Sequence, residues 1–407
     1  MLRKAVFVIL TLTGIQAYNQ KVCKTWFDYY VRPFSKNCWY EADVGKNIPE
    51  ILEHHFGAGG YENYSVTTQD GYILGMFRIL RDNPKGIVIL QHPVSSDGII
   101  YVSQGNESTA ITFWNEGYEV WIPNNRGTWY SEKHVNLTIN QFKYWDFTFH
   151  EIGMYDYPAI FEKISQVTGS NDLVFIGHSM AVSSSMVYAS LQPEHAKNHI
   201  KILIQMGPIT YFEHVKSPLS YVAPLANIFR KFTNLIHIGG MFTAHSFLEK
   251  AKNFLAFLPV GQIGLFIINL FCGWTPHEFD PKMFPLMTVM PRGFSLGVYY
   301  HYAQIVNAKG RFQMWNYGKK KNRLVYQSEQ PPEYPVEKIQ VPVYLMSSTG
   351  DSCATTGDAD VLFNKLSPKS KIYGQYKTTG LNHIGYHWGK DRNKVYKHML
   401  ELLNHIL

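Results

Sequence analysis

The sequence predicts an α/β protein with a mostly parallel central sheet that is covered by helices on both faces. Short apolar runs bounded by turn residues recur along the chain, and longer segments with helical spacing, such as 152–167, lie between them. Strands that have helices on both sides are buried on both sides, so they read as continuous apolar runs. The runs expected as strands are 86–92, 118–124, 173–178, 200–206 and 341–348.

Two segments depart from this rhythm. Residues 64–80 alternate β-forming side chains on both sides of Asp70-Gly71, which predicts a hairpin. The stretch from about 210 to 335 is rich in Phe, Pro and Gly and separates two expected strands, which predicts an inserted cap or lid subdomain. We therefore expect a signal peptide at 1–17, an N-terminal arm at 18–60, a core at 61–209 and 336–407, and a cap at 210–335.

The composition is that of a globular protein and excludes several functional classes. Of the 407 residues, 17% are charged and 15% aromatic, which leaves apolar surface to bury or to use. The formal net charge is +7, and the densest basic cluster is the short 319–323 segment, which is typical of a solvated loop. We therefore expect no nucleic-acid partner.

The first residues have the pattern of a secretory signal peptide. Arg3 and Lys4 precede an apolar run over 5–15, and Ala17 offers a small residue at the cleavage point. The run is too short to span a bilayer. We expect a secreted or lysosomal protein, and the sequons at Asn63, Asn106 and Asn136 are candidate glycan acceptors.

The number and spacing of the cysteines are compatible with an exported protein that contains a disulfide. Four are present, and three complete pairings are conceivable. Cys23 and Cys38 lie close together in a short arm that gains most from a covalent link, so we predict that bridge. We expect Cys272 and Cys353 to stay unpaired.

Residues 253–276 contain no formal charge, so they have two interpretations. A transmembrane helix is one, but Pro259, Gly261 and Gly264 are unfavourable in a lone span, which must satisfy every backbone group in lipid. We favour an amphipathic or buried cap segment. The apolar residues expected to act as the lid are Phe254, Leu258, Leu265 and Phe266.

The stretch FIGHSMAVSSS, residues 175–185, nearly matches the nucleophile elbow G-x-S-x-G. Gly177, Ser179 and Ala181 give G-x-S-x-A, and Ser179 stands between an expected strand and a helix-like stretch. Such a sharp turn presents the serine hydroxyl above the sheet and aims the next backbone N–H at a developing oxyanion. A serine that caps an ordinary helix is the alternative interpretation.

Two later residues strengthen the catalytic interpretation. Asp351 follows the expected strand 341–348, and His383 lies ahead of the final helix. The order serine, acid, histidine is that of an α/β-hydrolase fold. Cys353 could be read as a second nucleophile, but it has no assigned base and is more simply a packed thiol. His195 and His199 have metal-compatible spacing, yet Ala196 occupies the place of the glutamate in H-E-x-x-H, so we predict surface histidines, no metal site and no cofactor.

From about Tyr61 onward the chain resembles the acid lipases, the family of gastric lipase and lysosomal acid lipase. The matching motifs occur in the family's order: TTQDGYILGMFRI, ILQHPVSSD, GYEVWIPNNRGTWYS, YWDFTFHEIGMYDYPA, FIGHS, TGDSCA and LNHIGYHW. The resemblance implies that Ser179 is the nucleophile, Asp351 the acid and His383 the base. It also implies an oxyanion hole built from the N–H groups of Val94 and Met180.

The resemblance further implies a serine ester hydrolase that cleaves triacylglycerols or steryl esters at a lipid surface, which it contacts transiently. Three departures leave room for a rival. Pro93 and Ala181 stand where the family has glycine, and Gly385 stands where it has an aspartate. The family's disulfide within the cap is also absent. A lipid-binding or carrier protein with an impaired hydrolase fold is therefore the alternative hypothesis.

Overall fold

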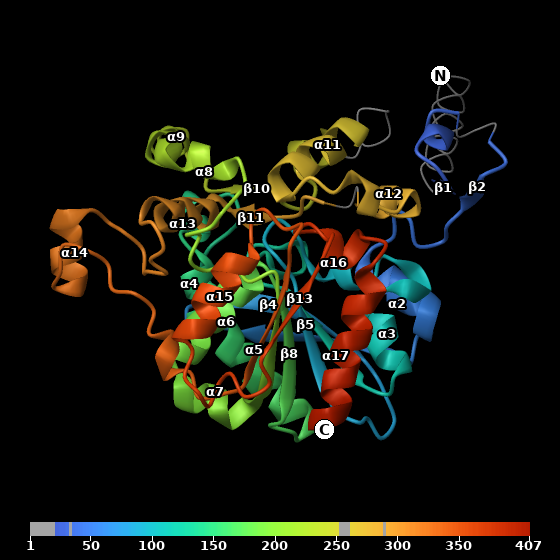
Figure 1. The fold of residues 1–407 in the computed structure, drawn as a ribbon, viewed down its shortest axis with the longest axis horizontal. Coiled ribbons are helices and arrows are strands. Elements are labelled where there is room, and N and C mark those ends of the chain that lie inside the picture. Colours follow the sequence, from blue (N-terminus) through green and yellow to red (C-terminus); the bar gives the residue numbers. More distant parts are fainter. Residues whose placement is uncertain (1–20, 32–34, 252–260, 288–289) are drawn as a thin grey trace.

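The computed structural model describes residues 21–31, 35–251, 261–287 and 290–407, and its centre is a nine-stranded sheet (Figure 1). The expected signal peptide and the expected lid residues Phe254 and Leu258 fall outside the described residues. The sheet order is β13-β12-β9-β8-β5-β6-β4-β3, with β7 paired to β4. Its strands are β3 (Tyr61–Thr67), β4 (Tyr72–Ile79), β5 (Ile87–Gln91), β6 (Glu119–Pro123), β7 (Lys133–His134), β8 (Leu173–His178), β9 (Ile200–Met206), β12 (Val343–Ser348) and β13 (Gln375–Thr378).

The mostly parallel α/β-hydrolase fold predicted from the sequence is confirmed. The contiguous set β6, β5, β8, β9, β12 and β13 is parallel, and the β3–β4 hairpin joins it antiparallel through β4. All five expected strands are present. Apolar patterning missed β7 and β13, because β7 is only two residues long and β13, with the sequence QYKT, is partly exposed and carries no apolar run.

Both faces of the sheet are buried. In β5, Ile87 and Ile89 belong to one core cluster, while Val88 and Leu90 belong to the other. The first cluster includes residues of α5 (Tyr157–Thr168), α6 (Met180–Leu191) and α7 (Pro193–His199). The second includes residues of α2 (Ile48–Phe56), α3 (Thr109–Asn115) and α17 (Arg392–Ile406). The two helical layers lie on opposite sides of the sheet in Figure 1.

A long segment between β9 and β12 lies across one end of the sheet (Figure 1). This segment occupies the place of the predicted cap, and its exact boundaries stay a prediction. Its elements are α8 (Leu219–Val222), α9 (Ala226–Leu235), β10 (Gly240–Met241), α11 (Gly261–Cys272), α12 (Phe284–Met287), β11 (Phe294–Ser295), α13 (Leu296–Asn307) and α14 (Lys319–Tyr326). The remaining helices are α4 (Phe149–Glu151), α15 (Thr356–Lys365) and α16 (Gly385–Trp388).

The N-terminal arm is a small hairpin of β1 (Lys21–Cys23) and β2 (Cys38–Tyr40). The disulfide between Cys23 and Cys38 links these strands, as predicted. The Tyr29 hydroxyl donates to the backbone oxygen of Pro281 at 2.7 Å, so the arm contacts the segment that leads into α12.

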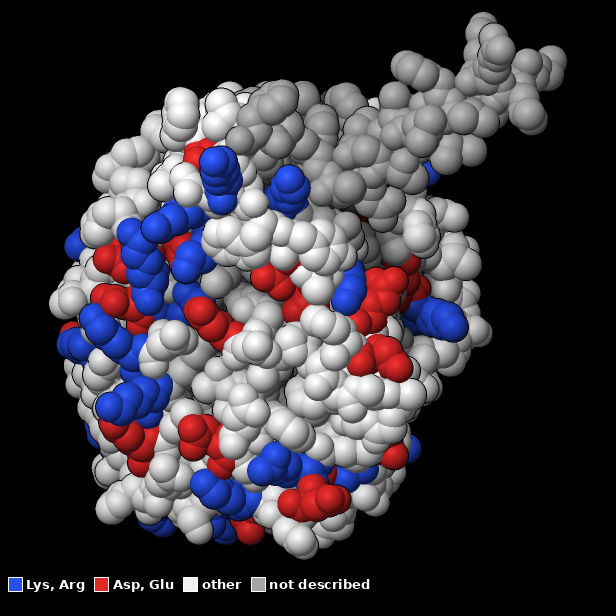
Figure 2. Space-filling view, turned by 90° about the vertical axis from the view of Figure 1, so that its right-hand side faces the viewer, with Lys and Arg blue, Asp and Glu red and all other residues white. Residues whose placement is uncertain are grey.

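On the face seen in Figure 2, basic and acidic side chains are interspersed rather than gathered into a field of one sign. Among the described residues, no helix combines the length and the apolar character that a membrane crossing requires.

A buried guanidinium joins three parts of the core. Arg126, in the loop after β6, is 2% exposed and donates to Asp70 in the β3–β4 turn and to Asp156 at the start of α5. Asp156 is fully buried, and burial raises its pKa to about 6 even though Arg126 opposes the shift. Through Asp70 and Asp156, Arg126 thus links the β3–β4 turn, the loop after β6 and α5.

Replacing Arg126 by methionine is expected to lower the free energy of unfolding by about 3 to 5 kcal/mol, because Asp156 would be left buried without its charge partner. Urea unfolding of the variant and the wild type measures this. The control is Arg311→Met, which removes the more exposed pair with Glu333 and should cost less than about 1 kcal/mol. Equal costs for the two variants would contradict the structural role of the buried network.

Candidate active site

Ser179 occupies a strained turn between the end of β8 and the start of α6. Its backbone has φ 58° and ψ −111°, an uncommon conformation for a residue with a side chain. The Ser179 N–H donates to the Met206 carbonyl of neighbouring β9 at 3.0 Å, which holds the turn against the sheet. This is the geometry of a nucleophile elbow rather than that of an ordinary helix cap, and the Ser179 side chain makes no capping hydrogen bond.

Ala181 stands in place of the second glycine of the elbow motif, and Gly177 leaves room for its methyl group. A Cβ atom placed on Gly177 would lie 3.1 Å from the Cβ of Ala181, 2.7 Å from Phe175 Cε1 and 3.0 Å from Gln205 Oε1. The space beside Ala181 is therefore free because Gly177 has no side chain. One methyl group fits at this crossing of strand and helix, whereas a second would require neighbouring atoms to shift.

The three residues predicted from the sequence come together in one hydrogen-bonded chain. His383 Nε2 lies 2.7 Å from Ser179 Oγ, and His383 Nδ1 lies 2.8 Å from Asp351 Oδ2. The other carboxylate oxygen, Asp351 Oδ1, accepts the backbone N–H groups of Cys353 and Ala354 at 2.8 Å each. These four hydrogen bonds are all 2.8 Å or shorter. In its neutral form, His383 accepts a hydrogen bond from the Ser179 hydroxyl and donates one to Asp351.

The pKa of His383 is shifted by two opposing effects. Burial lowers it, but the adjacent Asp351 carboxylate outweighs burial and raises the pKa to about 9. Asp351 therefore stabilises the imidazolium form of His383. A group that takes up a proton during a reaction benefits from such stabilisation, because positive charge develops on the ring as the proton arrives.

Two further histidines lie behind His383. His178 Nε2 donates to the backbone oxygen of His383 at 2.8 Å, and His387 Nε2 lies 3.2 Å from His178 Nδ1. Burial lowers the pKa of both rings, and neighbouring positive groups lower it further, to about 3 for His387. The two rings are therefore neutral and form a directed chain, His387 to His178 to the His383 carbonyl. Sequence reasoning did not single out either residue.

The predicted oxyanion donors lie at one pocket. Val94 and Met180 both line it, together with His92 and residues of the β11–α13 region. Within the described part of the chain, neither the Val94 nor the Met180 N–H donates to a protein acceptor. His92 is held by both ring nitrogens, because Nδ1 donates to the Pro93 carbonyl at 2.8 Å and Nε2 accepts from Asn125 N–H at 3.0 Å. The His92 ring therefore links the Pro93 carbonyl to the backbone at Asn125.

The segment between β9 and β12 braces the same loops. Arg292 N–H donates to the Ser95 carbonyl at 2.9 Å, and the Ser95 and Tyr299 hydroxyl oxygens lie 2.7 Å apart. At the end of α11, the Cys272 carbonyl accepts the N–H of Ser352 and the N–H of His383, each at 3.1 Å. The loops that carry the acid and the histidine thus share one acceptor on α11.

The two remaining cysteines are free, as predicted. Cys353 is buried, and its Sγ donates to the Phe271 carbonyl at 3.3 Å. A hydrogen bond with Cys272 and burial both raise the pKa of the Cys353 thiol well above its usual value. A neutral, packed thiol is a poor nucleophile, so Cys353 does not compete with Ser179.

The turn around Gly385, where the family has an aspartate, is formed by hydrogen bonds to Asn382. The Asn382 side-chain oxygen accepts the N–H of Gly385 at 3.0 Å and that of Ile384 at 3.2 Å. The Asn382 amide in turn donates to the Gly273 carbonyl at 3.0 Å. The turn that presents His383 is therefore closed by Asn382, without a carboxylate at position 385.

Comparison with known proteins places this geometry in a family. The family model described as "Partial alpha/beta-hydrolase lipase region" matches residues 54–105. Lipase 1 of Drosophila melanogaster is 30% identical over 359 residues, which cover 85% of this chain and 78% of that protein. The chain belongs to the acid lipase family. It is a lipase and therefore an ester hydrolase.

Other relatives of this acid lipase fit the assignment. Gastric triacylglycerol lipase of Rattus norvegicus is 29% identical over 379 residues, covering 89% of this chain and 92% of the relative. Lysosomal acid lipase/cholesteryl ester hydrolase of the same organism is 26% identical, with the same coverage. A solved structure of a putative lipase from Sulfolobus solfataricus has a TM-score of 0.57 at 14% identity, covering 85% of this chain and 94% of that one, which supports the fold alone.

The two residues of the predicted lid that the structure describes differ in exposure. Leu265 is half-buried and packs against the core, whereas Phe266 is exposed and contacts Trp274 edge to face. Sequence reasoning missed a second apolar surface on α9, although the helical spacing of its residues could have revealed it. The exposed apolar side chains of α9 are Ile228, Phe229, Phe232 and Leu235.

The three sequon asparagines, Asn63, Asn106 and Asn136, are all exposed. Exposure is what a glycan requires. Glycosylation stays a prediction.

Substituting Gly177 by alanine in this acid lipase should lower the rate of ester hydrolysis by about a hundredfold, because the new methyl group displaces α6 and with it the Ser179 hydroxyl. Initial rates on a soluble short-chain ester measure the effect. Ala181→Gly is the matched control and should keep the wild-type rate, since it only removes a methyl group. Equal activity of Gly177→Ala and the wild type would show that the elbow tolerates both methyl groups.

Substituting His387 by glutamine should make stability less dependent on pH. In the wild type the folded pKa of about 3 lies below the ordinary value of 6.5, so between them the unfolded chain binds a proton that the folded chain does not. This group therefore lowers the free energy of unfolding as the pH falls through that window, and it has no such effect above it.

Urea unfolding at several pH values measures the slope. The slope in His387→Gln should be smaller by up to about 1.4 kcal/mol per pH unit between about pH 3 and 6.5. His405→Gln, a change at an exposed residue of α17, is the control and should leave the slope nearly unchanged. Superimposable curves for His387→Gln and the wild type would contradict a neutral buried His387.

Proposed function

We propose that this acid lipase hydrolyses carboxylic esters of neutral lipids, such as triacylglycerols or steryl esters, through an acyl-enzyme on Ser179. The observation that carries the proposal is the chain Ser179–His383–Asp351, with its contacts of 2.7 and 2.8 Å. A triad of this order on a nucleophile elbow is the arrangement used for acyl transfer. The names of two relatives, one a triacylglycerol lipase and one a cholesteryl ester hydrolase, support the two substrate classes.

The proposed reaction assigns one role to each residue. His383 accepts the hydroxyl proton as Ser179 Oγ attacks the ester carbonyl, and it returns that proton to the leaving alcohol. Water then attacks the acyl-enzyme with His383 again acting as base, which releases the fatty acid and restores Ser179. Asp351 holds the ring and stabilises its charged form.

In both steps the carbonyl oxygen becomes an oxyanion. The free N–H groups of Val94 and Met180 at the pocket are its proposed donors. Removing one donor of this kind typically costs about 10² to 10³ in rate.

The proposed substrate surface is an aggregated lipid. The cap exposes apolar side chains on α9 and α11, among them Phe232 and Phe266, each more than half exposed. Apolar surface removed from water contributes about 25 cal/mol per Å², so contact of these helices with lipid would stabilise the bound enzyme. Displacement of the cap at that surface would open the pocket.

A secreted or lysosomal location is part of the proposal. The Cys23–Cys38 disulfide is typical of compartments outside the cytosol, and the expected signal peptide would direct the chain there.

Fatty-acid release from emulsified long-chain triacylglycerol and from a steryl ester, measured from about pH 4 to 8, tests the proposal. The wild type should hydrolyse at least one of them, and Ser179→Ala should reduce the rate by about 10⁴-fold or more, because no nucleophile remains. Phe232→Ser is the matched control for the lipid surface. It should slow hydrolysis of the emulsion and leave that of a soluble short-chain ester unchanged.

Binding of lipid without hydrolysis of any of these esters would contradict the proposal and favour a carrier. A wild-type rate in Ser179→Ala would contradict the assigned nucleophile.

A further inference from the structure

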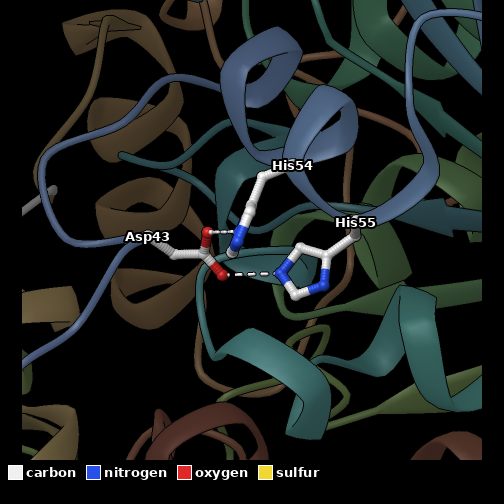
Figure 3. Close-up of side chains that lie close together, drawn as sticks. All are labelled: Asp43, His54 and His55. Atoms are coloured by element: carbon white, nitrogen blue, oxygen red, sulfur yellow. Dashed lines mark hydrogen bonds and ion pairs between the residues drawn. The ribbon is translucent and has the colours of Figure 1, made fainter.

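A carboxylate and two imidazoles meet where the loop after the β1–β2 hairpin passes the end of α2 (Figure 3). Asp43 lies in the loop that leads from the arm to α2, and His54 and His55 lie in the last turn of α2. Asp43 Oδ1 is 2.8 Å from His54 Nδ1, and Asp43 Oδ2 is 2.6 Å from His55 Nε2. Each carboxylate oxygen therefore faces one ring nitrogen.

We propose that Asp43, His54 and His55 bind a divalent transition-metal ion of the Zn²⁺ class. Within the described parts of the chain, these residues form the one group of three whose ligand atoms all lie within 4.8 Å of one another. Two imidazole nitrogens and a carboxylate form a common three-ligand set for Zn²⁺, with water in the fourth position. Nitrogen ligands disfavour Ca²⁺ and Mg²⁺, which prefer oxygen.

The electrostatics of the site favour a cation. The Asp43 side chain is 1% exposed, so its charge needs a partner. With both rings neutral the cluster carries one negative charge, which a divalent ion offsets. The ion would also lie at the C-terminal end of α2, where the helix dipole favours positive charge. Lys46 Nζ, 3.9 Å from Asp43 Oδ1, opposes binding, but its partly exposed side chain can turn into water.

Metal binding changes the tautomer of both rings. Without the ion, the ring N–H groups donate to Asp43. With it, each ring presents a lone pair, and its proton moves to the opposite nitrogen, His54 Nε2 or His55 Nδ1. Neither of these nitrogens has a protein partner among the described residues, so the change of tautomer breaks no other hydrogen bond.

A bound ion would link the loop after the β1–β2 hairpin to the C-terminal end of α2. The Cys23–Cys38 disulfide closes the arm on itself, whereas the metal would tie Asp43 to the far end of α2. The site is independent of ester hydrolysis, so its test does not depend on the proposed function.

Titration of the chelator-treated mature protein with Co²⁺ at about pH 7.5 tests the site, since Co²⁺ in a tetrahedral nitrogen and oxygen site absorbs visible light. We expect saturation at one ion per chain and displacement by Zn²⁺. Asp43→Asn and His55→Gln should each weaken binding at least about tenfold. Zn²⁺ should raise the melting temperature of the wild type and not that of His55→Gln.

The double variant His195→Gln/His199→Gln is the matched control, because it removes the other metal-compatible histidine pair and should bind like the wild type. Far-ultraviolet circular dichroism checks that each variant is folded. Absence of saturable Co²⁺ binding would overturn the proposal. Wild-type binding by a folded His55→Gln, or loss of binding in the control, would also overturn it.

Discussion

The backbone of Ser179 is the constraint on which the site depends. Its left-handed φ of 58° turns the chain from β8 directly into α6, and the turn is held by the hydrogen bond from Ser179 N–H to Met206 on the next strand. Such a conformation persists only where the surroundings fix it. Here β8 lies between β5 and β9 in the sheet, and both of its faces are packed. The rigidity of the centre of the sheet thus sets the position of one hydroxyl group.

Local packing accounts for the backbone at each of the three departures from the family pattern. Strand and helix must approach closely beside Ser179, and Gly177 alone supplies the missing volume, so Ala181 can carry a methyl group. Asn382 closes the turn of His383 through its own side chain, which makes an acid at position 385 unnecessary for that turn. Pro93 lies in a loop that His92 and the Arg292 N–H hold from two sides.

The segment between β9 and β12 is hydrogen-bonded to the loops of the candidate active site. The Cys272 carbonyl at the end of α11 accepts hydrogen bonds from the loops of both Asp351 and His383. A movement of the cap that carried this end of α11 away would break both bonds and disturb the acid and the histidine together. In the proposed displacement of the cap, the C-terminal end of α11 would therefore have to stay in place. The exposed apolar faces of α9 and of the rest of α11 are then the parts free to meet the lipid.

Local pattern determined much of this protein. Apolar runs identified the five central strands, the G-x-S-x-A stretch identified the elbow, and chain order pointed to Asp351 and His383. Short spacing in a small arm pointed to Cys23 and Cys38. These features depend on residues close in sequence or on the order of the elements along the chain. Both can be recognised from periodicity and motifs in the sequence.

Only the tertiary structure decided the rest, because it depends on which distant segments pack together. The His387–His178 chain behind His383, the shared acceptor at Cys272 and the Arg126 network join residues that no spacing rule connects. Asp43 and the histidines of α2 are close in sequence, yet their meeting depends on how the arm enters the helix. β13 is partly exposed and has few apolar residues, and it pairs with the edge of β12. Its own sequence does not indicate this pairing.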